Sequence, residues 1–161
     1  MQSKGGEKMK KGFTLIELLA VIVILAIILL IAMPIVLNVI NEARKGAFNS
    51  TGFGLVKAAE NEYMRAALGG ATEATLYTFT SGVSVVISGN LDNLDYAGEG
   101  PESGTLTVAA DGTIKMAISN GVYCVVKEGD STDVNAYDET ELGAKYTGKD
   151  LDDCTVALLG L

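Results

Sequence analysis

The chain has 161 residues, of which 48% are apolar and 6% aromatic, and its formal net charge is −8. This length allows one modest globular unit with an appendage and excludes a multidomain enzyme. The absence of histidine excludes a Ser-His-Asp triad, a Cys-His pair and a His-ligated metal site, so we expect no enzyme and no cofactor. The acidic balance also argues against a protein that coats nucleic acid.

Charged residues are unevenly distributed along the chain. Residues 1–12 carry four lysines and one glutamate, and residues 18–41 carry no charge. Residues 70–161 carry fifteen acidic residues and four lysines, a net charge of −11. A basic start, an apolar stretch and an acidic remainder are typical of a membrane-inserted protein whose larger part is exported.

The apolar stretch is long enough to span a membrane. Residues 18–37 read LLAVIVILAIILLIAMPIVL, and a helix of this length rises about 30 Å, which crosses the hydrocarbon core of a bilayer. A cleaved secretory signal is the alternative, but its apolar region has only about 7–15 residues and is followed by a small-x-small site, which NVINEARK lacks. The preceding lysines predict a cytoplasmic N-terminus, with the chain after residue 41 outside.

Two residues of this region stand out. Glu17 lies one residue before the uninterrupted apolar run. It is either an interfacial carboxylate favoured by the helix dipole, or a buried charge that needs a partner from another chain. Pro34 removes one helical hydrogen bond and therefore predicts a kink or a loosened turn.

Residues 10–22 read KKGFTLIELLAVI. Lysines, then Gly12 and Phe13, a glutamate at the fifth place counted from Phe13, and about twenty apolar residues resemble the class III signal of type IV pilins and pseudopilins. Pro34 also falls where pilins commonly carry a helix-loosening proline. The resemblance covers residues 8–42, and the remainder of the chain is interpreted from its own pattern.

The resemblance implies a processing pathway. A prepilin peptidase on the cytoplasmic face removes residues 1–12 by cutting between Gly12 and Phe13, and the new amino group of Phe13 is methylated. Met9 is an alternative start to Met1 and leaves this cleavage site unchanged.

The resemblance also implies an assembly mechanism. Subunits leave the cytoplasmic membrane with the help of the pilus assembly machinery and form a helical homopolymer, the extracellular pilus filament on the cell surface. In this filament Glu17 pairs with the N-terminal amine of a neighbouring subunit. An unpaired carboxylate is very unfavourable in an apolar bundle, so the pair acts as a check on register.

The helix is predicted to continue beyond the membrane as an amphipathic half. Apolar residues recur on one helical face up to a stop at Gly69-Gly70, and they are Phe48, Leu55, Ala59, Tyr63 and Ala66. Three glycines, at 46, 52 and 54, predict a bent or frayed helix there. The predicted organisation is a leader at 1–12, an apolar membrane and filament-core helix at 13–41, the amphipathic half at 42–69 and a head at 70–161.

The head is predicted to be an antiparallel sheet. Residues 70–82 have no helical period and are expected to be a connection, and strands are expected at 83–88, 105–109, 113–118 and 122–127. Three-residue loops at 110–112 and 119–121 would set Leu106 opposite Met116 and Met116 opposite Cys124. One apolar face then covers the helix, with Cys124 on that side. The expected fold class is α+β, a long N-terminal helix packed on a C-terminal antiparallel sheet, as in the pilin fold.

Cys124 and Cys154 both lie on the exported side, where disulfides persist. Pilins often carry a C-terminal bridge, so the resemblance favours a disulfide between the two, with two free thiols as the alternative. The tail ending in TVALLGL is expected to return as an edge strand or to pack onto the sheet.

Residues 128–141 are dense in oxygen ligands. The weak candidates for a calcium site are Asp130, Asp133, Asn135 and Asp138. Because the EF-hand order is absent, a solvated acidic loop is the favoured interpretation and no metal is expected.

These patterns and the resemblance together predict a structural subunit, the major pilin of a type IV pilus, that serves adhesion, motility or aggregation. A pseudopilin of a type II secretion or DNA-uptake system is the nearest alternative. An uncleaved membrane protein with one span and a small binding head is an alternative of a different class.

Overall fold

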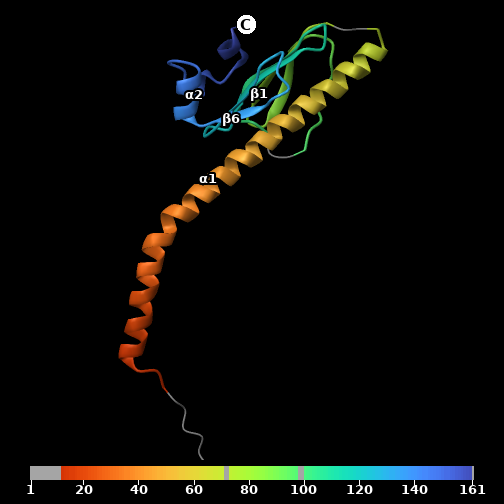
Figure 1. Cartoon of the computed structure of the whole chain (residues 1–161). Coiled ribbons are helices and arrows are strands. Elements are labelled where there is room, and N and C mark those ends of the chain that lie inside the picture. Colours follow the sequence, from red (N-terminus) through yellow and green to blue (C-terminus); the bar gives the residue numbers. More distant parts are fainter. Residues whose placement is uncertain (1–11, 71–72, 98–99, 161) are drawn as a thin grey trace, which may run out of the picture. The chain divides into compact units, whose positions relative to one another are not determined.

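The computed structural model describes residues 12–70, 73–97 and 100–160 (Figure 1). The leader up to residue 11 therefore lies outside the described residues. The chain divides into two compact units, one ending at Asn41 and the other beginning at Glu42. The first unit is the apolar part of helix α1, and the second holds the rest of that helix with the sheet and the C-terminal segments.

Helix α1 spans Leu15–Leu68 and contains Pro34. It ends at the predicted Gly69-Gly70 stop, where Gly70 has a φ of 77° that favours glycine. The helix continues through residues 46–54 without interruption, so fraying, one of the two predicted alternatives, is wrong. Its buried face packs on the sheet there, and this packing outweighs the roughly 1 kcal/mol by which each glycine disfavours a helix.

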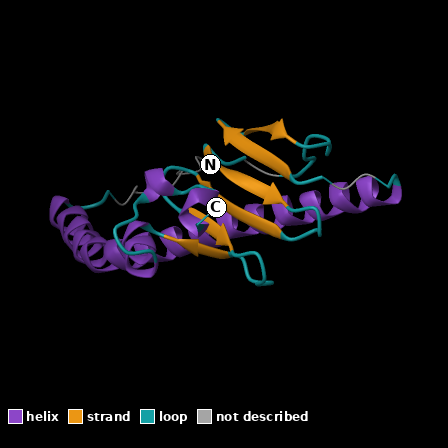
Figure 2. Ribbon diagram, turned by 90° about the horizontal axis from the view of Figure 1, so that it is seen from above, coloured by secondary structure: helices purple, strands orange, loops and turns teal. Residues whose placement is uncertain are grey.

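The head contains a six-stranded antiparallel sheet in the order β2-β1-β3-β4-β5-β6 (Figure 2). The strands are β1 (Thr75–Thr80), β2 (Val83–Ser88), β3 (Ser103–Val108), β4 (Ile114–Ser119), β5 (Cys124–Lys127) and β6 (Asn135–Tyr137). Helix α2 (Glu139–Lys145) and the 3₁₀ turns η1 (Leu151–Asp153) and η2 (Val156–Leu159) follow. The α+β fold class is confirmed, but the expected connection at 70–82 is wrong because it contains β1.

The main core lies between the sheet and the second half of α1. Residues on the predicted helical face contribute to it as expected: Phe48, Leu55 and Ala59 are buried, and Tyr63 and Ala66 pack against the cluster. The sheet supplies the inward-facing residues of the central strands, which include Tyr77, Phe79, Leu106, Val108, Ile114, Met116, Ile118 and Val125.

The first hairpin has the predicted register. Leu106 lies opposite Met116, and the three-residue loop closes with the Ala109 amide donating to the Thr113 carbonyl at 2.8 Å. Gly112 takes a φ of 88°, the left-handed conformation that this loop requires.

The predicted register of the second hairpin is wrong. Cys124 lies opposite Ser119 instead of Met116. The side-chain oxygen of Asn120 accepts hydrogen bonds from the amides of Val122 and Tyr123, at 3.2 and 2.9 Å, and so stabilises a wider loop. A shift by an odd number of residues moves every side chain of the strand to the other face.

Cys124 therefore faces away from α1, which corrects the prediction that it lies on the helix side. A disulfide joins it to Cys154. The pair belongs to a second, smaller buried cluster with Ala117, Val126 and Leu142, against which Leu158 and Leu159 of the tail pack. The tail thus packs onto the outer face of the sheet and forms a 3₁₀ turn. Of the two predicted alternatives, packing onto the sheet is therefore confirmed and the edge strand is wrong.

Glu141 stabilises the N-terminus of helix α2 and also links this helix to α1. Glu141 completes a capping box with Asp138, whose side chain accepts from the Glu141 amide at 2.8 Å. The same Glu141 carboxylate forms an ion pair with Lys45 of α1. The acidic segment after β5 is thereby folded back onto the head.

Gly52 and Gly46 give a pair of glycine variants with opposite expected effects. A Cβ on Gly52 would lie 2.5 Å from Val125 Cγ1 and 3.1 Å from Val134 Cγ1, whereas a Cβ on Gly46 would meet nothing within 4 Å. We expect Gly52→Ala to destabilise the head by about 1–3 kcal/mol through overpacking. We expect Gly46→Ala to stabilise it by up to about 1 kcal/mol through helix propensity.

Chemical unfolding of the two full-length variants in detergent micelles, monitored by tyrosine fluorescence, measures the change in the free energy of unfolding for each. A Gly52→Ala protein as stable as Gly46→Ala would contradict the close packing of α1 on β5.

Candidate processing and assembly segment

The residues around the predicted cleavage site precede the helix. Gly12, Phe13 and Thr14 have no regular secondary structure and are exposed, with Phe13 at 84%. The helix begins at Leu15, and the Thr14 hydroxyl accepts a hydrogen bond from the Glu17 amide at 3.3 Å. The bond between Gly12 and Phe13 therefore lies in an exposed segment that precedes the helix.

Glu17 occupies the first turn of α1, and its side chain is exposed in the isolated chain. No ion pair within residues 12–70, 73–97 and 100–160 involves it. The dipole of the helix N-terminus favours a carboxylate at this position. The ion pairs of the described residues thus leave this carboxylate without a cation.

The apolar half of α1 is exposed along its whole length. From Phe13 to Ile40 every residue is exposed except Ala32, which is half-buried. The helix is long and apolar enough to cross a membrane, by length and composition. More than twenty apolar residues cannot remain in water, so this unit needs lipid or other apolar helices around it.

Residues 8–33 match the family described as the prokaryotic N-terminal methylation motif. This motif is the class III signal that is characteristic of type IV pilins and pseudopilins. It supports a type IV pilin-like or pseudopilin protein. The resemblance inferred from the sequence is thereby confirmed. No curated protein and no solved structure matches the chain.

The motif implies that a prepilin peptidase processes this pilin-like chain and that the chain enters a pilus assembly pathway. Together with the apolar helix it fits insertion into the membrane before assembly. The family match points to a structural protein and not to an enzyme.

The candidate calcium ligands of the head are not gathered around one point. Within the described residues, no three aspartate, glutamate or cysteine side chains could hold one metal ion. Asp138 caps α2, and the Asp133 amide donates to the Ser131 hydroxyl at 2.9 Å. Asn135 begins β6.

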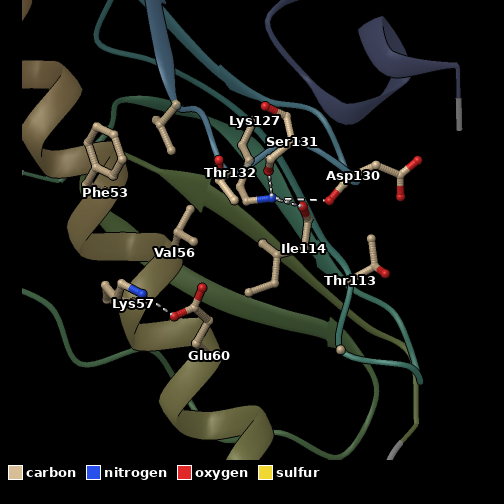
Figure 3. A pocket seen from close by; sticks show the side chains of 13 residues that line it. Phe53, Val56, Lys57, Glu60, Thr113, Ile114, Lys127, Asp130, Ser131 and Thr132 are labelled. Carbon is tan, nitrogen blue, oxygen red and sulfur yellow. Dashed lines mark hydrogen bonds and ion pairs between the residues drawn. The ribbon is translucent and has the colours of Figure 1, made fainter.

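A buried ammonium, which the sequence analysis missed, lies beside this acidic segment. Lys127 ends β5 and is only 7% exposed. Its ammonium donates to four backbone carbonyls, those of Ile114 at 3.0 Å, Glu128 at 3.3 Å, Gly129 at 3.3 Å and Ser131 at 2.8 Å. Figure 3 shows Lys127 beside Ile114 and Ser131. One side chain thus connects the start of β4 to the turn that follows β5.

The ammonium lies at a cavity of about 470 Å³ between α1 and the 128–134 segment, and the apolar wall includes Phe53, Val56 and Ile114 (Figure 3). Burial lowers the pKa of Lys127, and the carboxylates of Glu60 and Asp130 oppose that shift. Because carbonyl oxygens already surround the ammonium, Lys127 has a structural role: it links β4 to the turn after β5, and it does not serve as a nucleophile. The position of a lysine at the end of an apolar strand could have indicated a buried ammonium with hydrogen-bond acceptors around it, since lysine is rarely buried without partners.

Proposed function

We propose that the chain is the major pilin of a type IV pilus, a structural subunit that polymerises through its apolar helix into an extracellular filament for adhesion, motility or aggregation. The observation that carries this proposal is the methylation motif at residues 8–33, which includes the start of an apolar helix that is exposed from Leu15 to Ile40 except at Ala32. Lipid before assembly and identical helices after assembly both provide the apolar surroundings that such a helix needs.

In this proposal the peptidase removes residues 1–12 and the amine of Phe13 is methylated. Residues 13–41 form the filament core, residues 42–69 carry the head, and residues 70–161 lie outside. Gly12 supports the cut because a residue without a side chain adopts extended conformations easily and leaves room for a peptidase. The exposure of Gly12 and Phe13 supports access to this bond.

Glu17 has the assembly role in this proposal. Its carboxylate lacks a cation within the described residues, and cleavage creates one at the amine of Phe13 of the neighbouring subunit. In a dry bundle a charge of either sign is stable only when it is paired, so correct register is favoured over every misaligned one. Pro34 loosens the helix by one hydrogen bond, which helps it adapt from bilayer to bundle.

A pseudopilin of a type II secretion or DNA-uptake system shares the motif and is the second candidate. An uncleaved membrane protein with a small binding head differs from both because its Gly12–Phe13 bond remains intact.

Mass spectrometry of the protein isolated from its own cells tests the proposal. We expect a chain that begins at Phe13 and is heavier by one methyl group, and we expect electron microscopy to show long surface filaments that antibodies to the head decorate. An intact residue 1–12 segment would contradict the processing pathway. A cleaved and methylated chain without long filaments would favour the pseudopilin.

A further inference from the structure

The backbone around the ammonium of Lys127 offers more acceptors than the ammonium has donors. Four carbonyl oxygens lie between 2.8 and 3.3 Å from Nζ, and they belong to Ile114, Glu128, Gly129 and Ser131. An ammonium has only three N–H donors. The four oxygens therefore surround a positive centre and are not matched one by one to donors. We call this group of four oxygens the carbonyl site.

The oxygens of the carbonyl site have supports other than the ammonium. The Ser131 amide donates to the Glu128 carbonyl at 3.2 Å and closes the turn after β5. The Asp133 amide donates to the Ser131 hydroxyl at 2.9 Å in the same segment. The fourth oxygen is that of Ile114, which begins β4 and is paired with β3. Removal of the Lys127 side chain therefore leaves backbone that still brings the four oxygens together.

The chemistry of the carbonyl site suits a monovalent ammonium better than calcium. All four of its oxygens are neutral backbone carbonyls, whereas calcium sites include carboxylates and have distances of about 2.3–2.6 Å. The carboxylates of Glu60 and Asp130 act from further away, where they favour a positive charge on Lys127 against the effect of burial.

The cavity of about 470 Å³ beside α1 gives access to this site, because Lys127 is among its lining residues. Phe53, Lys57 and Thr132 also line the cavity and are exposed, so it opens to solvent. Its wall combines apolar side chains, such as those of Phe53 and Val56, with polar groups. A small cation with a short alkyl chain matches this lining.

We infer that the carbonyl site is a binding site for one primary ammonium ion, and that Lys127 supplies this ion from within the chain. The turn after β5 is then held by a tethered cation and needs none from outside. When the side chain is removed, a free alkylammonium ion binds in its place. This inference requires neither cleavage nor a filament, so it goes beyond the proposed function and is tested separately from it.

The test replaces the side chain with its missing part. Lys127→Ala removes Cγ, Cδ, Cε and the ammonium, and n-propylammonium supplies the same atoms. Urea unfolding of the full-length variant in detergent micelles measures the folding equilibrium constant as n-propylammonium chloride is added. We expect a saturable rise of about tenfold or more, because the ion binds the folded state alone. We also expect slower amide hydrogen exchange at residues 128–131. If the variant is unfolded without the ion, we expect the ion to fold it.

Tetramethylammonium chloride at the same concentration is the control for charge and ionic strength, since this cation has no N–H donor. We expect it to leave the Lys127→Ala protein unchanged, and we expect the same of calcium at equal ionic strength.

Lys57→Ala is the matched variant. It removes an ammonium that lines the same cavity but is 72% exposed and pairs with the Glu60 carboxylate at 2.6 Å. We expect n-propylammonium and tetramethylammonium to act equally on this variant, and equally on the unaltered protein, whose carbonyl site is occupied.

Equal effects of the two ammonium salts on Lys127→Ala would overturn the inference. So would stabilisation by calcium alone, a Lys57→Ala protein that responds to n-propylammonium as Lys127→Ala does, or a Lys127→Ala protein that stays unfolded at every concentration of the ion.

Discussion

Replacing Glu17 with alanine is expected to leave cleavage and methylation intact and to abolish filaments. The variant removes the carboxylate that we propose to pair with the Phe13 amine of the next subunit, and this leaves a cation unpaired in an apolar bundle. Loss of one partner of a buried ion pair costs about 3–5 kcal/mol. Every subunit added to the polymer would carry this penalty, so the equilibrium for each addition falls by about a hundredfold or more.

Thr14→Ala is the matched control for this prediction. It removes the hydroxyl that accepts from the Glu17 amide at the start of α1 but retains the carboxylate. If Glu17 acts only by stabilising the helix N-terminus, the two variants should have similar effects on filament number. Mass spectrometry of membranes, together with counts of filaments by electron microscopy, distinguishes processing from assembly. Filaments of normal number and length from a cleaved Glu17→Ala chain would refute the pairing.

The sequence predicted those parts of the fold that depend on local pattern. Helix α1 ends at Gly69-Gly70, and the first hairpin has the expected register, because glycines with positive φ fix both features. The methylation motif is also a local pattern, because it consists of one short continuous segment. The family match at residues 8–33 confirms that the chain has this motif. The individual roles of Gly12, Phe13 and Glu17 stay predictions.

The errors arose where side chains or distant segments decide the structure. In the second hairpin, one amide side chain, that of Asn120, holds two backbone amides and shifts the register, which a count of apolar residues does not detect. Strand β1 was missed because its inward residues, Thr75, Tyr77 and Phe79, alternate with Leu76 and threonines, so the apolar alternation is weak. The burial of Lys127 depends on the carbonyl of Ile114, which lies on a neighbouring strand.

Replacing Lys127 with methionine is expected to destabilise the head by about 2–4 kcal/mol. Methionine keeps an apolar side chain of similar length but leaves four backbone carbonyls without their shared donor. Methionine also removes the desolvation penalty that lowers the pKa of Lys127, and this gain offsets part of the loss. The net effect is destabilising because the buried Ile114 carbonyl and the three partly buried carbonyls lose their donor, and a buried acceptor without a partner costs more than its hydrogen bond contributes when formed.

Lys115→Met is the matched control because Lys115 lies on the adjacent strand β4 and its ammonium makes no hydrogen bond or ion pair within the described residues. We expect this control to change stability by less than about 0.5 kcal/mol. Urea unfolding of both full-length proteins in micelles gives the two values, and amide hydrogen exchange shows where the change acts. Exchange should accelerate at residues 128–134 in Lys127→Met and not in Lys115→Met. The Lys127 ammonium donates to the carbonyls of that turn, whereas Lys115 contacts the turn only through the carbons of its side chain, which methionine largely retains. Equal stabilities, or unchanged exchange in this turn, would mean that the acidic segment is held by its other contacts, such as the pairing of β6 with β5 and the link from Lys45 to Glu141.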